Sequence, residues 1–217
     1  MKNYLIAALL AFSGTSALAQ TQQGTVVLSG SLSISRQAYD NDIGPEQTNS
    51  TNVTVGIYPA AGYFVKDNLE AGTELLLDYT SQSAYSSDAS IFPDKYHTYA
   101  IGLSPYLRKY WPVANQLYLT GKASASASYN FLNVAFSDHE SQVMSTGHTL
   151  GLSLSPGLTF FATEHISLHG SLGMISFQRY SPNLKNDIIV GEYSSSNFSF
   201  SLLPSTISFG MSYYINQ

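Results

Sequence analysis

The sequence predicts an all-β fold, an eight-stranded antiparallel up-and-down transmembrane β-barrel, on three observations. Apolar residues alternate with small or polar residues along most of the chain, as strands with one apolar face require. Long polar stretches alternate with short turns between these strands, which is typical of an even-numbered barrel with both termini on the short-turn side. Finally, only 11% of the 217 residues are charged, whereas soluble domains carry about 25%.

The first residues predict export. Lys2 precedes an apolar run at residues 4–12, and Ala17-Leu18-Ala19 follows. This order is that of a secretory signal peptide cleaved after Ala19, and the run is too short to cross a bilayer as a helix. We therefore expect residues 1–19 to be a signal peptide and residues 20–217 to form one outer-membrane β-barrel domain. The absence of cysteine excludes a disulfide scaffold.

The first four predicted strands cover residues 24–36, 53–63, 69–79 and 96–108. In the first, leucine, isoleucine and valine share one face and serines occupy the other. The second and third form a hairpin about the polar turn at residues 65–68, with one apolar face and one face that carries three carboxylates. A soluble sandwich would show that polar face to water, whereas a membrane barrel would turn it inward.

The last four predicted strands cover residues 117–131, 149–160, 166–177 and 198–215, and each shows the same alternation. In the seventh, the apolar face carries Ile166, Leu168, Leu172 and Met174. In the eighth, the apolar face switches from even to odd numbers, which predicts a β-bulge at residues 204–206.

Four polar stretches lack this periodicity: residues 37–52, 80–95, 132–146 and 178–196. We predict that they are long loops facing outward, and that the three short turns face the periplasm. Apart from Arg36, at the end of the first predicted strand, the apolar faces of the strands carry no Lys, Arg, Asp or Glu. A charge near the bilayer midplane would be penalised there, so this pattern favours the membrane barrel over the sandwich.

Aromatic residues recur just before each short turn. Such residues gather at the membrane–water interface, so we predict a periplasmic-side aromatic girdle made of Tyr63, Phe64, Tyr110, Phe160 and Phe161.

The predicted inward face is mostly Ser, Gly, Thr and Ala, with a charged minority: Glu70, Glu74, Asp78, Arg108 and Lys122. These residues lie on three neighbouring strands. The lumen of an eight-stranded barrel is just wide enough for side chains to fill, and buried charges must be paired. We therefore predict a lumen ion-pair network, with a gated ion path or a small-ligand pocket as the alternative.

Catalytic and metal sites have weak support. His165 and His169 share a predicted strand face with Ser167 and Ser171, but this face points to the lumen, and an enzyme acting on lipid needs its residues at the outer rim. Asp138-His139-Glu140 lies on a predicted loop, where adjacent residues rarely fix a coordination shell. We expect no catalytic residue, no metal and no cofactor.

Four segments resemble the small outer-membrane β-barrel proteins common in Bacteroidetes-type Gram-negative bacteria, relatives in shape of the OmpX-like and OmpA-like eight-stranded barrels. They are GTVVLSGSLS at residues 24–33, PAAGYFVKDNLEAG at 59–72, SPGLTFF at 155–161 and ISFGMSYYI at 207–215. The resemblance implies an outer-membrane location and contact with the barrel-insertion machinery. Such chains usually end on an aromatic residue, whereas this one ends on Asn216-Gln217.

The expected function is that of a non-enzymatic integral outer-membrane protein with a structural or surface-interaction role. Its expected partners are outer-membrane lipid, the insertion machinery and, through the loops, surface polysaccharide or host molecules. The net charge of −5 argues against a nucleic-acid partner. Three alternatives stay open: a narrow channel or small-solute transporter, a lipid-modifying enzyme and a soluble secreted β-sandwich.

Overall fold

The computed structural model describes residues 19–43, 46–86, 95–136, 139–184, 195–201 and 208–215. Residues 1–18 of the predicted signal peptide, the predicted bulge and the last two residues lie outside these ranges. A short 3-10 turn, η1, covers Ala19–Thr21. The strands are β1 (Val26–Ile43), β2 (Glu46–Lys66), β3 (Leu69–Ser86), β4 (Lys95–Ala114), β5 (Leu117–Phe136), β6 (His139–Phe161), β7 (Ile166–Ser171), β8 (Met174–Leu184), β9 (Ser195–Ser201) and β10 (Phe209–Ile215). No helix of the described residues is long and apolar enough to cross a membrane.

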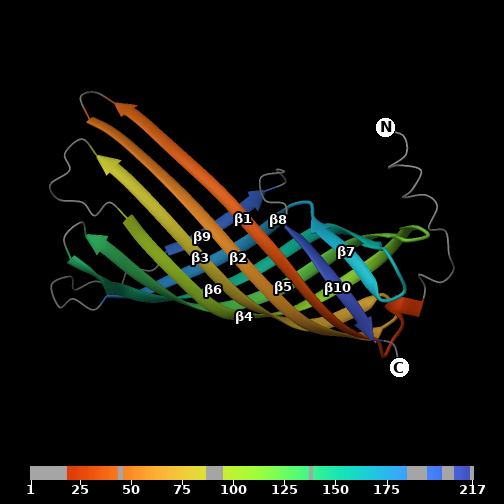
Figure 1. Ribbon diagram of the computed structural model, residues 1–217. Helices are drawn as coiled ribbons and strands as arrows, with labels where there is room; N and C mark the ends of the chain where they lie inside the picture. The colour runs from red at the N-terminus through yellow and green to blue at the C-terminus, as the bar shows by residue number, and fades with distance from the viewer. Residues whose placement is uncertain are drawn as a thin grey trace.

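The ten strands occupy eight places in an antiparallel ring (Figure 1). The first six follow one another around the ring, and β6 then pairs with both β7 and β8. β7 and β8 therefore share one place in the ring. β10 pairs with β7 and β9 pairs with β8, so β9 and β10 share the next place. The ring closes where β10 pairs with β1. This arrangement confirms the predicted eight-stranded antiparallel barrel.

The outward faces are apolar and open to the surroundings, as the two-residue period predicts. Leu32 is 59% exposed, Leu103 55% and Leu152 61%. Their neighbours in sequence face inward, because successive side chains of a strand point to opposite faces. Side chains of this kind are stable at a surface only where lipid, rather than water, surrounds them.

Two of the four polar stretches predicted as long loops, residues 37–52 and 132–146, are mostly strand, so the prediction is wrong there. In the other two, the described residues 80–86, 95, 178–184 and 195–196 are strand as well, and the remainder lies outside the described part of the chain. β1 and β2 stay paired as far as Ile43 and Glu46, and β5 pairs with β6 as far as Phe136 and His139. The reason is that the ladder is made by backbone groups, which continue to pair where the apolar alternation has stopped. Figure 1 shows the β1–β2 hairpin extending to the upper left, far from the short turns at the lower right.

A bulge separates β7 from β8. Between Ser171 and Ile175 the chain holds one more residue than the facing stretch of β6 between Leu154 and Gly157. Gly173 has a φ of 148°, which glycine adopts without a steric penalty. The extra residue reverses the two faces, so Met174, which we predicted to face outward, lines the lumen instead.

The predicted periplasmic girdle needs correction. Phe64, Tyr110 and Phe161 are at most 1% exposed and point into the lumen. In Tyr63-Phe64 and in Phe160-Phe161 only one residue of each pair is able to face lipid, because neighbours in a strand point to opposite sides. Tyr63 is 44% exposed, and it shares the turn side with two outward residues that we did not predict, Trp111 and Tyr213, which are 47% and 48% exposed.

A second outward aromatic group lies on the loop side, over β3 to β6. Tyr79 packs against Tyr99 with ring centroids 5.1 Å apart, and Tyr129 packs against Phe131 at 4.7 Å. Tyr99 and Trp111 are twelve residues apart on β4, which is about 40 Å along the strand and about 30 Å across the membrane at the usual tilt. The hydrocarbon core of a bilayer is about 30 Å thick, so the two groups mark its two interfaces.

Candidate functional site

The turn end of the lumen is filled by a cluster of apolar and aromatic side chains. We call it the turn-end cluster, and its members are Val27, Phe64, Tyr110, Tyr118, Phe161 and Tyr214, each at most 1% exposed. Phe161 packs against both Tyr118 and Tyr214 with ring centroids 5.1 Å apart. Aromatic rings in such tilted and edge arrangements interact favourably. The cluster therefore closes the lumen at this end.

The chain just before β1 lies beneath the turn-end cluster. The backbone N–H of Asn68, in the β2–β3 turn, donates to the carbonyl of Thr21 at 2.7 Å. The side chains of the same two residues are hydrogen-bonded at 2.8 Å. The Gln20 amide donates to the carbonyl of Thr163, in the β6–β7 turn, at 2.7 Å. Residues 20 and 21 thus connect two turns across the closed end.

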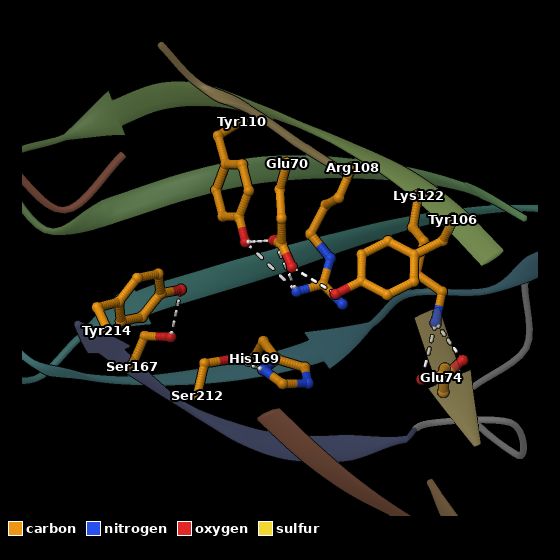
Figure 2. Close-up of polar contacts among 10 residues, drawn as sticks. All are labelled: Glu70, Glu74, Tyr106, Arg108, Tyr110, Lys122, Ser167, His169, Ser212 and Tyr214. Atoms are coloured by element: carbon orange, nitrogen blue, oxygen red, sulfur yellow. Dashed lines mark hydrogen bonds and ion pairs between the residues drawn. The ribbon is translucent and has the colours of Figure 1, made fainter. Parts of the chain in front are cut away.

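Above the cluster lies the first part of the predicted ion-pair network. Glu70 is completely buried and accepts hydrogen bonds from the hydroxyls of Tyr106 and Tyr110, both at 2.5 Å. Arg108 also donates to Glu70, at 3.5 Å, and to the hydroxyl of Tyr110, at 3.3 Å. Figure 2 shows the carboxylate held between these groups. The charges of Glu70 and Arg108 therefore lie together, as buried charges must.

Small residues make room for these large side chains. A Cβ added at Gly62 would lie 2.5 Å from Glu70 Oε1 and 2.8 Å from the Tyr106 hydroxyl oxygen. Gly72 faces Tyr106 directly across the β3–β4 ladder, and a Cβ there would lie 2.6 Å from its ring. Glycine is therefore required at positions 62 and 72, because the side chains of Glu70 and Tyr106 approach the backbone there too closely for a Cβ.

The second ion pair lies one layer higher. Lys122 donates to both carboxylate oxygens of Glu74, at 3.0 and 2.8 Å. The Tyr106 ring lies near both cations, with Arg108 Cζ 5.2 Å and Lys122 Nζ 5.3 Å from its centroid. Tyr106 therefore connects the two pairs, since a ring face attracts a cation within about 6 Å.

Asp78 is placed apart from these pairs. It accepts a 2.5 Å hydrogen bond from the hydroxyl of Tyr58, and among the described residues the two ion pairs are Glu70 with Arg108 and Glu74 with Lys122. Our sequence reasoning did not single out Tyr58, Tyr106 or Tyr214. All three have even numbers, which place them on the polar face of their strands. This position in the alternation could have identified them as inward residues.

The structure does not pair the histidines with the serines considered above. His165 is exposed before β7, beside Tyr213, and not in the lumen as its number suggested. His169 contacts Ser212 at 3.2 Å, whereas Ser167 bonds to the Tyr214 hydroxyl at 3.0 Å (Figure 2). The described residues also contain no group of three His, Cys, Asp or Glu side chains that could hold a metal. Asp138 lies outside them.

Between the ion pairs and the loop end lies a cavity of about 340 Å³, which we call the lumen cavity. Serine hydroxyls from most of the strands line it, together with Tyr58, Asp78 and His169. A second cavity of about 430 Å³ lies beyond it, lined by Thr98, Asn130, Tyr180 and Asn197 among others. Such a polar interior can hold water or a small hydrogen-bonding molecule.

A family model described as outer membrane protein beta-barrel domain matches residues 5–213. No curated protein sequence matches the chain significantly. The structure is similar to the outer membrane protein OprG from Pseudomonas aeruginosa, with a TM-score of 0.54 and 10% identity over 92% of this chain and all of that one. It also matches Ail, the attachment invasion locus protein of Yersinia pestis, over 89% of this chain and all of that one, with a TM-score of 0.39 and 14% identity. At these identities the likeness to OprG concerns the fold alone, and the likeness to Ail is too distant to carry an argument.

Proposed function

The chain belongs to the outer membrane protein β-barrel domain family, and we propose that its barrel is a non-enzymatic anchor that carries surface-exposed hairpins into contact with other molecules. The protein lies in the outer membrane, where lipid surrounds the apolar face of the ring. The proposed partners of the hairpins are surface polysaccharide and host molecules. The observation that carries the proposal is the length of the hairpins.

The hairpin of β1 and β2 extends well beyond the apolar band. The last outward apolar residue of β1 that belongs to the band is Ile34, and from Arg36 to Ile43 the strand stays paired with β2. Eight residues of strand reach about 25 Å, whereas a membrane strand needs only about 9–11 residues. Paired strands hold their side chains in a fixed arrangement, and polar projections on a rigid scaffold are common binding sites.

The closed turn end supports the role of an anchor rather than that of a channel. The turn-end cluster fills the lumen on the periplasmic side, and an eight-stranded barrel has little room beside its own side chains. A narrow channel would need a continuous wet path past Phe64, Phe161 and Tyr214. The buried pairing of Glu70 and Arg108 fits a stabilising role for the lumen charges.

The same proposal includes the division of the chain into a signal peptide at residues 1–19 and a mature barrel from Gln20. The contacts of Gln20 and Thr21 with the turns support a role for these residues in the mature protein. We also propose that the barrel-insertion machinery receives the chain in the periplasm. Mass spectrometry of the protein extracted from outer membranes tests the cleavage site, and a first residue other than Gln20 contradicts it.

The test of the surface role uses cells that display the full chain. A variant in which residues 37–52 are replaced by a two-residue turn keeps the strands of the apolar band. We expect it to lose binding to immobilised bacterial surface polysaccharide or to host-cell monolayers, with equal surface abundance and an unchanged shift on unheated gels as controls. Binding that survives shortening of every hairpin would contradict the proposal. Steady single-channel conductance of the purified protein would favour the narrow channel instead.

A further inference from the structure

Asp78 lies in the wall of the lumen cavity, beyond the two ion pairs. It follows Glu74 by four residues on β3, which is about 13 Å along the strand. The hydroxyl of Tyr58 donates to Asp78 Oδ1 at 2.5 Å, and both side chains line the cavity. A phenol satisfies part of the hydrogen-bonding capacity of a carboxylate, but it does not neutralise the charge.

The backbone around Asp78 is shaped to hold this contact. Gly56 faces Asp78 across the β2–β3 ladder, and a Cβ at Gly56 would meet the Tyr58 hydroxyl and lie 2.6 Å from Asp78 Oδ1. Glycine therefore leaves the space through which Tyr58 reaches the carboxylate. On the other side, across the β3–β4 ladder, the neighbour of Asp78 is the small residue Ala100.

No Lys or Arg of the described residues is placed to balance the charge of Asp78. Of the nine in the sequence, Arg108 and Lys122 line the lumen cavity, and each already has its own carboxylate. The other seven are Lys2 in the predicted signal peptide, Arg36, Lys109 and Arg179 on outward positions of their strands, Lys66 at the turn end of β2, Lys95, and Lys185 after the end of β8. The backbone of Lys95 pairs with Ser83, five residues beyond Asp78 and about 17 Å along the strand. Lys185 lies outside the described part of the chain, and residues 202–207, also outside it, are LLPSTI and carry no charge.

The described part of the lumen therefore holds three carboxylates and two cations. His169, the histidine in the lining of the cavity, belongs to β7, on the opposite side of the ring from β3. A charge taken out of water without a partner is costly, and this cost is offset when a counter-charge joins it. The arrangement around Asp78 thus favours a cation that comes from outside the chain.

The lining of the lumen cavity indicates what kind of cation fits. Asp78 belongs to no group of three His, Cys, Asp or Glu side chains among the described residues, so a metal ion would lack ligands there. The lining contains eleven serines instead. Ser124 and Ser153 are hydrogen-bonded to each other at 2.7 Å, but each hydroxyl keeps further acceptor capacity. Such a surface suits a molecule that carries several hydroxyl groups.

We propose that the lumen cavity binds a small hydroxylated primary amine, of the size of a single amino sugar, with its ammonium group on Asp78 and its hydroxyls on the lining serines. The ammonium group supplies the missing positive charge and three hydrogen-bond donors. This inference is independent of the proposed surface role of the hairpins.

The size of the lumen cavity suits one sugar ring. At about 340 Å³ the cavity lies at the lower end of the roughly 300–1,000 Å³ typical of small-molecule sites. The turn-end cluster closes the lumen below it. Gln178 lines both this cavity and the second one, so the polar space continues from Asp78 toward the loop end.

The test measures binding of radiolabelled glucosamine to the full mature chain in detergent micelles by equilibrium dialysis, in slightly acidic buffer that keeps the amine protonated. Glucose is the matched comparison, because it has a hydroxyl where glucosamine has the ammonium group. N-acetylglucosamine keeps the nitrogen but not the charge. We expect saturable binding of glucosamine, and binding at least about tenfold weaker for the two uncharged sugars, because they lose the charged hydrogen bond to Asp78.

Asp78→Asn removes the charge and keeps the shape of the side chain, so it should weaken glucosamine binding about tenfold, to the level of glucose. Glu164→Gln changes the net charge equally at an exposed position in the β6–β7 turn, and it should bind glucosamine as the unaltered protein does. If Asp78→Asn lacks the gel shift of a folded barrel, Asp78→Ser replaces it, because serine already lines the cavity.

A second readout separates a ligand contact from a structural role. Asp78→Asn should unfold in urea at the same concentration as the unaltered protein, or at a higher one, because no buried cation loses its partner. Glucosamine should raise the unfolding midpoint of the unaltered protein, since a ligand that binds only the folded state stabilises it. It should leave the midpoint of Asp78→Asn unchanged.

Three results overturn the proposal. If the folded protein does not bind glucosamine, or binds glucose equally well, Asp78 does not select an amine. If Asp78→Asn binds glucosamine as tightly as the unaltered protein, the amine lies elsewhere. If binding is lost when residues 37–52 are replaced by a two-residue turn, the amine binds the acidic β1–β2 hairpin and not the lumen cavity.

Discussion

Tyr110 donates a 2.5 Å hydrogen bond to the completely buried Glu70 at the closed end of the lumen. The tyrosine belongs to the turn-end cluster and the glutamate to the ion pairs above it, so this bond joins the apolar and the charged layers of the lumen. A carboxylate held by two phenols and a guanidinium has its lone pairs satisfied without water.

Replacing Glu70 with Gln should strongly destabilise the barrel. The change leaves the buried Arg108 without its counter-ion, which costs about 3–5 kcal/mol when one partner of a buried pair is removed. The measurement is urea-induced unfolding in lipid vesicles. Glu74→Gln is the matched control, and it should cost less, because the side chains of Lys122 and Glu74 are 21% and 12% exposed. Equal losses for the two variants would argue against the importance of burial here.

Removing two rings of the turn-end cluster should open the periplasmic end. Phe64→Ala and Phe161→Ala each delete a buried ring, at a cost of about 3–5 kcal/mol per substitution. The double variant should conduct ions in a planar bilayer, whereas the unaltered protein should not. Tyr63→Ala, next to Phe64 but facing outward, serves as the control and should give no ion conductance. A double variant that folds but gives no ion conductance would show that other residues close the lumen.

Gly62→Ala should destabilise the protein although the change adds only one methyl group. The new Cβ would lie 2.5 Å from Glu70 Oε1, so the glutamate and Tyr106 must move, at a cost of about 1–3 kcal/mol for overpacking. Gly30→Ala is the control, because a Cβ at Gly30 meets nothing within 4 Å. The readout is again urea unfolding, and similar stability of the two alanine variants would contradict the packing described for the lumen.

Leu103→Arg should test the membrane position of the apolar band. Leu103 lies between Tyr99 and Trp111 on β4 and is 55% exposed, so the new charge would face hydrocarbon, at a cost of about 2–4 kcal/mol. Ala38→Arg, on the projecting part of β1, should cost little because its side chain faces water. Unfolding in vesicles measures both, and a Leu103→Arg variant as stable as Ala38→Arg would contradict the assignment of this band to the bilayer.

The strand pattern made most of the fold predictable. The alternation in residues 53–79 predicted a hairpin, and the structure contains it as β2 and β3 with the predicted faces. Alternation alone failed where the ladder continues without it, as in residues 37–52, and where a bulge reverses the faces, as at Gly173. Backbone pairing depends on the partner strand, which the local sequence does not display.

The candidate site was predictable as a set of inward residues but not as contacts. The numbering placed Glu70, Glu74, Arg108 and Lys122 on one face, and the structure places them in two pairs. It places Asp78 with Tyr58 instead, and it turns Phe64, Tyr110 and Phe161 inward, where we had expected a girdle.

The sequence by itself determined which side of the wall most strand residues face and how many places the ring has, because a period of two is a local property of the chain. Only the tertiary structure decided which inward residues meet and how the turn end is closed. These depend on register, bulges and ring closure, which bring together residues as distant as Val27 and Tyr214. A local sequence pattern does not show which residues far apart in the chain come together.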